Sequence, residues 1–151
     1  MRKRGFEIIS AYSQAGIILP ARKTRASAGY DIAAAEDAVI EPGAVALIAT
    51  GLKAYMPENE YLAVHIRSGL SVKSRLSLIN GQGIIDSDYY NNADNEGHIL
   101  IAIYNHGQDS VAIAKGSRIA QGIFQPYGIT DQDDQPPALR RGGFGSTGSG
   151  E

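Results

Sequence analysis

The stretch YLAVHIR, residues 61–67, decides the fold class because its apolar side chains recur at every second position. Leu62, Val64 and Ile66 occupy these positions, and a period of two places them on one face of an extended strand. The stretch ILIAIY, residues 99–104, is apolar throughout. This pattern is typical of a central strand that is buried on both faces. Both stretches predict β-structure.

Similar short segments recur along the chain, and each ends at Gly, Pro, Asn or a neighbouring polar residue. They are FEIIS (6–10), AVIEPG (38–43), VALIATG (45–51), LSLINGQGIID (76–86), HILIAIYNHG (98–107), VAIAKG (111–116) and RIAQGIFQPY (118–127). The best helical candidate is SGLSVKSR (68–75), with at most two turns. Many short strands separated by turn residues predict an all-β sandwich, jelly roll or barrel.

The composition limits the classes of function. The 151 residues are the length of one ordinary domain, and the net charge of -2 gives no positive field to hold a DNA or RNA polymer. The absence of cysteine excludes disulfides and thiolate catalysis. No apolar run is long enough to span a membrane, so we expect a cytoplasmic protein with no membrane or nucleic-acid partner.

The last 21 residues differ in character from the rest of the chain. From Asp131 the sequence reads DQDDQPPALRRGGFGSTGSGE, which is too polar and too rich in glycine to add to a core. It is typical of a disordered tail, or of an arm that becomes ordered on a ligand. We therefore expect a core at residues 1–130 and a flexible arm at residues 131–151.

Two acids end the apolar stretch GIIDSDYY, residues 83–90. A strand end followed by a turn explains many Asp-Ser-Asp runs. On an extended backbone, however, Asp86 and Asp88 would project to the same face, and either could hold a water as general base. The ring of Tyr89 could then pack on a sugar.

Three other segments carry polar groups that suit an anion. Arg67 and Ser68 lie at a glycine turn, which is either a solvated loop or an oxyanion cradle. The segment RASAGYDI (25–32) places Asp31 at a turn before a strand. Gln121 lies on the face of Ile119 and Ile123, where its amide faces either the core or a ligand.

In this order, these segments resemble the five motifs of the homotrimeric dUTPase family across nearly the whole chain. The matching stretches are SAGYDI (27–32), RSGLS (67–71), NGQGIIDSDY (80–89), GSRIAQGIF (116–124) and GGFGSTG (142–148). The resemblance implies a jelly-roll-like subunit in a homotrimer with active sites at the subunit interfaces. It also implies Mg²⁺-assisted attack of water on the α-phosphorus of dUTP, which gives dUMP and pyrophosphate.

The resemblance also implies a role for individual residues. Asp86 would hold the attacking water, and Tyr89 would stack on the deoxyribose and exclude a 2'-hydroxyl. The other uracil and sugar contacts would be Asn80, Gly83, Ile85 and Phe144. The phosphate contacts would be Arg67, Ser68, Gly69, Gln121, Arg140, Arg141, Gly145, Ser146 and Thr147, with Asp31 organising charge behind them. Mg²⁺ would be held by phosphates and waters, without a direct protein ligand.

Two departures from the family pattern stand out. Residues 90–98 insert a polar loop after Tyr89, where the family turns at once. Leu139 holds the usual place of the arm arginine, so Arg140 or Arg141 would reach the γ-phosphate. Two alternatives remain open: a dCTP deaminase-like enzyme of the same fold, and a nucleotide-switched regulatory protein whose partner binds the insert.

Overall fold

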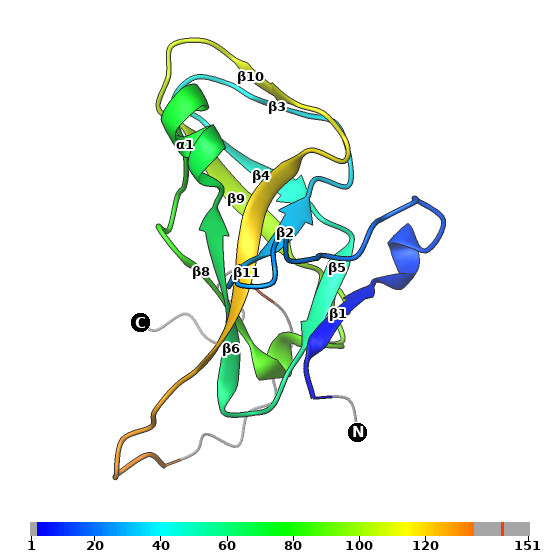
Figure 1. Ribbon diagram of the computed structural model, residues 1–151, viewed down its shortest axis with the longest axis vertical. Coiled ribbons are helices and arrows are strands. Elements are labelled where there is room, and N and C mark those ends of the chain that lie inside the picture. Colours follow the sequence, from blue (N-terminus) through cyan, green and yellow to red (C-terminus); the bar gives the residue numbers. More distant parts are fainter. Residues whose placement is uncertain (1–2, 135–142, 144–151) are drawn as a thin grey trace.

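A computed structural model of the chain describes residues 3–134 and residue 143, and it consists mainly of β-strands (Figure 1). The strands are β1 (Gly5–Ile8), β2 (Tyr30–Ala33), β3 (Ala38–Ile40), β4 (Val45–Ala49), β5 (Leu52–Tyr55), β6 (Glu60–Ile66), β7 (Leu76–Leu78), β8 (Gly83–Asp86), β9 (Leu100–Asn105), β10 (Val111–Ile113) and β11 (Arg118–Pro126). One α-helix, α1 (Ser68–Ser74), and two short 3₁₀ helices, η1 (Ser10–Tyr12) and η2 (Ser87–Tyr89), complete the described elements. The predicted all-β class is confirmed.

The strands pair in an antiparallel manner and form a sandwich. One layer is the four-stranded sheet β2-β11-β6-β8, and the other is the three-stranded sheet β4-β9-β7 (Figure 1). The two-stranded ribbons β1-β5 and β10-β3 extend the layers. Within the described residues no sheet closes on itself, so the structure is a jelly-roll-like sandwich rather than a closed barrel.

The space between the layers is filled by aliphatic side chains. Ile32, Leu62 and Ile103 are fully buried there. Each such side chain contributes roughly 1.5–3 kcal/mol to stability. Ion pairs at the surface, such as that between Arg4 and Glu60, contribute little, because water and salt screen them. The core therefore stabilises the sandwich far more than its surface charges do.

The two stretches that predicted the fold class behave differently. In β9, Ile101, Ala102 and Ile103 are all buried, which confirms a central strand. In β6 the prediction of a single buried face was wrong, because Ala63 on the outer face is buried as well. Ala63 lies between Ile123 of β11 and Ile84 of β8, whose larger side chains flank it on the same face.

Sequence periodicity did not predict β2 and β5, and it predicted β7 and β8 as a single segment. The missed strands β2 and β5 contain Asp31 and Lys53 at positions where a buried strand would be apolar. LSLINGQGIID is the hairpin of β7 and β8, joined by a turn at residues 79–82. The predicted short helix is confirmed as α1, and no helix among residues 3–134 has the length and apolarity to cross a bilayer.

Candidate active site

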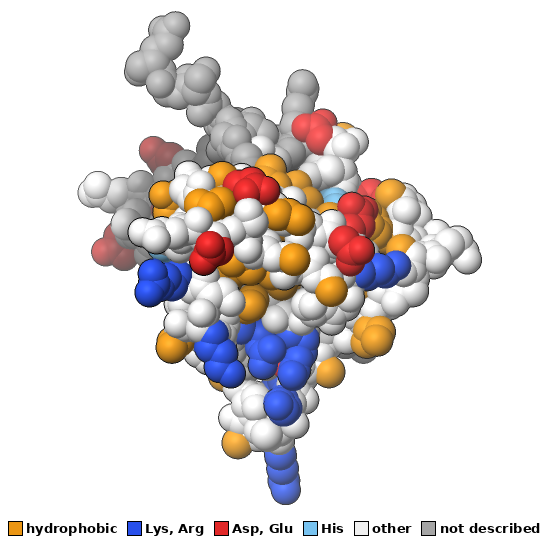
Figure 2. Space-filling model, turned by 90° about the horizontal axis from the view of Figure 1, so that it is seen from above, with side chains coloured by type: hydrophobic (Ala, Val, Ile, Leu, Met, Phe, Trp, Pro, Cys, Tyr) orange, Lys and Arg blue, Asp and Glu red, His pale blue; other side chains and the backbone are white. Residues whose placement is uncertain are grey.

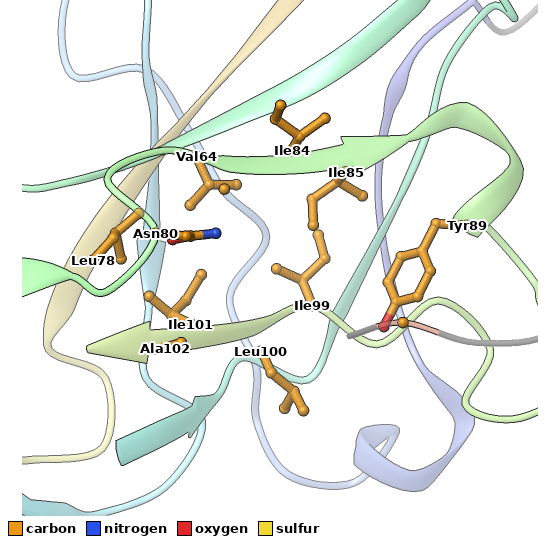
Figure 3. A pocket seen from close by; sticks show the side chains of 12 residues that line it. Val64, Leu78, Asn80, Ile84, Ile85, Tyr89, Ile99, Leu100, Ile101 and Ala102 are labelled. Atoms are coloured by element: carbon orange, nitrogen blue, oxygen red, sulfur yellow. The ribbon is translucent and has the colours of Figure 1, made fainter. Parts of the chain in front are cut away.

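An apolar slot lies between the edge strand β8 and the strand β9 of the other layer. Its volume is about 160 Å³, and most of its walls are aliphatic (Figure 3). Figure 3 shows that Ile85 and Ile99 point toward each other across the slot, whereas Ile84 points to the opposite side of β8. The predicted uracil and sugar residues that line the slot are Asn80, Gly83, Ile85 and Tyr89.

The slot has polar groups at its rim. The side chain of Asn80, in the turn between β7 and β8, is directed into the slot (Figure 3). Strand β8 pairs with β6 on one side only among the described strands. Backbone N–H and C=O groups on the other side of an edge strand can bind a planar, hydrogen-bonding ligand.

Asp86 ends β8, and the chain turns immediately after it. Residues Ser87–Tyr89 form η2, so the extended backbone that would place Asp86 and Asp88 on one face is not present. Asp86 is half-buried and Asp88 is exposed. The same turn brings Tyr89 back to the slot that Ile85, the residue before Asp86, also lines.

Tyr89 forms one wall of the slot and is almost completely buried, with 5% of its surface exposed. Its hydroxyl donates a hydrogen bond to the carbonyl oxygen of His98 at 2.8 Å and accepts one from Nδ2 of Asn95 at 2.8 Å. Gly143 also lines the slot, and a side chain at this position would lie 3.1 Å from the Tyr89 hydroxyl oxygen.

A second cluster gathers charged residues around Asp31. The carboxylate of Asp31 accepts a hydrogen bond from Nη1 of Arg118 at 2.9 Å and forms an ion pair with Nε of Arg67 at 3.4 Å. Arg118 was not predicted, although it lies inside the GSRIAQGIF stretch. Ser68 and Gly69 are exposed at the start of α1, directly after Arg67.

Gln121 belongs to this charged cluster rather than to the core. In register it lies beside Asp31 on β2 and His65 on β6. A side chain on Gly29 would lie 2.4 Å from Oε1 of Gln121, so glycine leaves the room that the Gln121 amide occupies. The neighbouring Gly122 faces Leu62 in the core, which places Gln121 on the opposite face.

Asp86 and the charged cluster lie at different ends of the same sheet. Asp86 pairs with Tyr61 at one end of β6, and Arg67 follows the other end of β6. Six residues of extended strand span about 20 Å. Among the described residues, one chain therefore holds Asp86 and Arg67 too far apart for both to contact one α-phosphate.

The surface charge is also distributed unevenly. Figure 2 shows Lys and Arg side chains gathered on one part of the face seen from above, apart from most Asp and Glu side chains. A local basic region therefore exists despite the net charge of -2. Such a region can attract a polyphosphate even though the net charge of the protein is negative.

The remaining predicted site residues lie in the arm. Phe144, Arg140, Arg141, Gly145, Ser146 and Thr147 are outside the described residues, as is most of the predicted arm at residues 131–151. Within the described part of the chain, no group of three or more His, Asp or Glu side chains could hold a metal ion by itself.

His98, at the end of the loop beside Tyr89, makes the stability of this region pH-dependent. The backbone N–H of Gly51 donates to Nε2 of His98 at 3.0 Å, which requires an unprotonated nitrogen. Burial lowers the pKa of His98 below its ordinary value of 6.5, and the Glu36 carboxylate opposes this effect more weakly. The ring of Tyr12 packs against the imidazole, 5.3 Å between centroids.

We expect the free energy of unfolding to fall as the pH falls below 6.5, because the unfolded chain then binds a proton that folded His98 resists. The binding of one proton changes the free energy of unfolding by at most about 1.4 kcal/mol per pH unit. Urea unfolding of the wild type and of His98→Gln, between pH 7.5 and 5.5, measures the difference. The same pH dependence in both proteins would contradict this assignment.

The fold and the site define a class: a β-sandwich protein with an apolar slot and a cluster of two arginines around an aspartate. The model of the dUTPase family matches residues 15–150. The chain belongs to the dUTPase family.

Two relatives illustrate the similarity. A deoxyuridine 5'-triphosphate nucleotidohydrolase of Lactococcus lactis is 50% identical over 150 residues, which cover 99% of this chain and 100% of the relative. The enzyme of that name from Desulfitobacterium hafniense (strain DCB-2) is 41% identical over 138 residues, with 86% and 87% coverage.

Solved structures agree with this assignment. The crystal structure of dUTPase from Streptococcus mutans is 44% identical and has a TM-score of 0.80, covering 84% of this chain and 98% of that one. The dUTPase from phage phi11 of S. aureus has a TM-score of 0.73 and covers 91% and 99% of the two chains. At 23% identity, the phage protein shares the fold.

Proposed function

We propose that this protein hydrolyses dUTP to dUMP and pyrophosphate, with Asp86 holding the water that attacks the α-phosphorus. Family membership and the names of the curated relatives support dUTP hydrolysis over deamination of dCTP. The single observation that carries the assignment of roles is the slot between β8 and β9, with the Tyr89 ring as a wall and Asp86 directly after the lining residue Ile85.

The slot suits uracil for two reasons. The edge of β8 and the amide of Asn80 offer hydrogen-bonding groups beside an apolar cavity. Cytosine would present a donor where uracil presents an acceptor, and a 5-methyl group would contact the slot wall. Tyr89 would exclude a 2'-hydroxyl, while Gly83 and Ile85 would contact the base and sugar.

The charged cluster suits the triphosphate. Arg67, Ser68, Gly69 and Gln121 would bind phosphate oxygens, and Asp31 would orient Arg67 through the ion pair at 3.4 Å. Arg118, on the other Asp31 oxygen, would help to fix that carboxylate. Attack on a triphosphate depends mainly on positioning and on neutralising charge, so a carboxylate base is sufficient for Asp86.

Mg²⁺ is the cofactor that fits this arrangement. Because Asp31 is already paired with two arginines, the ion would reach the site on the phosphates of the substrate and on their waters. Bound in this way, it would neutralise phosphate charge. A structure of a mutant dUTPase from phage phi11 of S. aureus describes the coordination of a structural Mg(II) ion in that protein.

We infer that the complete site is assembled between chains of a homotrimer. The separation of about 20 Å along β6 supports this inference, because one chain cannot apply Asp86 and Arg67 to the same phosphate. The predicted arm, with Phe144 over the base and Ser146, Thr147, Gly145 and Arg140 or Arg141 on the phosphates, would complete the pocket. The position of Gly143 beside Tyr89 supports an approach of the arm to the slot.

Incubation with dUTP, dCTP, dTTP and UTP in parallel, with and without Mg²⁺, tests this function. We expect pyrophosphate and dUMP from dUTP, a rate at least about 100-fold lower with each other nucleotide, and strong loss of turnover when EDTA removes Mg²⁺. Release of ammonia from dCTP, or equal hydrolysis of dUTP and UTP, would contradict the proposal. Liquid chromatography of the products distinguishes these outcomes.

A further inference from the structure

We propose that the inserted loop at residues 90–98 fixes the Tyr89 ring, and that Asn95 is thereby a positioning residue for the exclusion of ribonucleotides. This inference rests on the proposed function, because it assumes that Tyr89 meets the sugar. The insert would then position a residue of the site, in addition to the partner-binding role that the sequence suggested for it.

The loop is folded around two asparagine side chains. Nδ2 of Asn92 donates to the backbone oxygen of Tyr89 and to Oδ1 of Asn95, both at 2.8 Å. Oδ1 of Asn92 accepts from the backbone N–H of Asp94 and of Asn95, at 3.0 and 3.1 Å. Asn92 is 7% exposed, so these hydrogen bonds are protected from water.

Asn95 connects this loop to the Tyr89 hydroxyl. Its Oδ1 accepts from the backbone N–H of Gly97 at 3.0 Å, and its Nδ2 donates to the hydroxyl oxygen at 2.8 Å. The hydroxyl in turn donates to the carbonyl of His98 at 2.8 Å. Asn92 therefore holds the backbone of Tyr89, and Asn95 and His98 hold the far end of its ring.

The loop also closes tightly on Tyr89. Gly97 has a φ of +85°, and a side chain there would lie 2.6 Å from the backbone oxygen of Tyr89, so only glycine fits. The loop is anchored from outside by Lys53, whose Nζ donates to Oδ1 of Asn91 at 2.6 Å and to Glu96 at 3.2 Å. The backbone N–H of Ser10 donates to the other Glu96 carboxylate oxygen at 2.9 Å.

The Tyr89 ring can exclude a 2'-hydroxyl only if the ring keeps its position. Rotation of the Tyr89 side chain would move the ring away from the sugar and make room for a 2'-hydroxyl. The two hydrogen bonds at the hydroxyl oppose this rotation, and the buried setting makes each unmade bond costly. The loop would thus act on the discrimination between nucleotides rather than on the chemical step.

The test compares the wild type, Asn95→Ala, Tyr89→Phe and the double variant. We measure kcat/KM for dUTP and UTP, and the Kd of dUMP and UMP by calorimetry. We expect Asn95→Ala to reduce the preference for the deoxynucleotide about five- to tenfold in both ratios, with kcat for dUTP largely kept. Tyr89→Phe, which keeps the ring and removes only the hydroxyl, is expected to show a similar loss.

The double variant shows whether Asn95 acts through the hydroxyl. In the Tyr89→Phe background, Asn95→Ala should add little to the loss of preference. Asp94→Ala is the matched control, because its side chain is exposed in the same loop and should leave the preference unchanged. An equal loss for deoxy- and ribonucleotides, or fully additive effects, would overturn the proposal.

Two further outcomes are distinguishable. If Asn95→Ala does not fold, the proposal is tested by Tyr89→Phe alone. An unchanged preference for the deoxynucleotide in that variant would overturn the role of the hydroxyl. If the wild type neither hydrolyses dUTP nor binds dUMP, the proposed function itself fails, and the positioning role fails with it.

Discussion

Asp86→Asn is expected to lower kcat for dUTP by about 10²–10⁴-fold, the usual contribution of a positioned general base. The amide has the shape of the carboxylate but cannot accept the proton of the attacking water. Asp86 lies at the end of β8 and does not belong to the core cluster, so the fold should persist. Pyrophosphate release measures turnover, and calorimetry with a non-hydrolysable dUTP analogue measures binding, which should be largely kept.

Asp88→Asn is the matched control for this substitution. The two acids are two residues apart, but the turn at η2 leaves Asp88 exposed and Asp86 half-buried. Only Asp86→Asn should lower turnover to this extent. Unchanged pyrophosphate release in Asp86→Asn, or an equal loss in both variants, would show that the attacking water is held elsewhere.

Truncation after Asp134 is expected to reduce turnover by roughly two to four orders of magnitude and to leave a folded protein. Loss of the arm would remove the proposed phosphate contacts and the closure over the base together, and positioning and charge stabilisation each contribute several kcal/mol to catalysis. The described core extends no further along the chain than Phe124, so the truncation removes none of it. Steady-state kinetics and thermal unfolding measure the two effects.

Phe144→Ala in the full chain separates closure over the base from the phosphate contacts. We expect a smaller loss of turnover than in the truncation, because the arm arginines and hydroxyls remain. The oligomeric state of each variant is measured by light scattering as a control. Near-normal turnover of the truncated protein would contradict a catalytic role for the arm.

Much of the fold could be predicted from local patterns. Period-two alternation and continuous apolar runs indicated most of the strands, because both patterns reflect which faces of a strand are buried. The strands that were missed, β2 and β5, contain Asp31 and Lys53, whose partners lie far away in the sequence. A buried lysine is stable only when it is paired, and a single sequence does not show the pair.

The site was predictable in part. The motif residues Asn80, Gly83, Ile85 and Tyr89 meet in one slot, and Asp31, Arg67 and Gln121 meet in one cluster. Arg118 was missed because its partner Asp31 is 87 residues away. The sequence suggested the insert only as a feature that could bind a partner, and it did not show that the side chains of Asn92 and Asn95 bond to Tyr89 and to each other.

The sequence by itself determined the β-class, the short helix and the identity of the motif residues, because each depends on side chains within a few positions of one another. Only the tertiary structure decided that Asp86 and the arginine cluster lie at opposite ends of one sheet, and that the loop after Tyr89 holds its ring. Strand register and long-range hydrogen bonds determine those placements. They join residues that are far apart in the sequence, and the local periodicity of the sequence does not reveal such pairs.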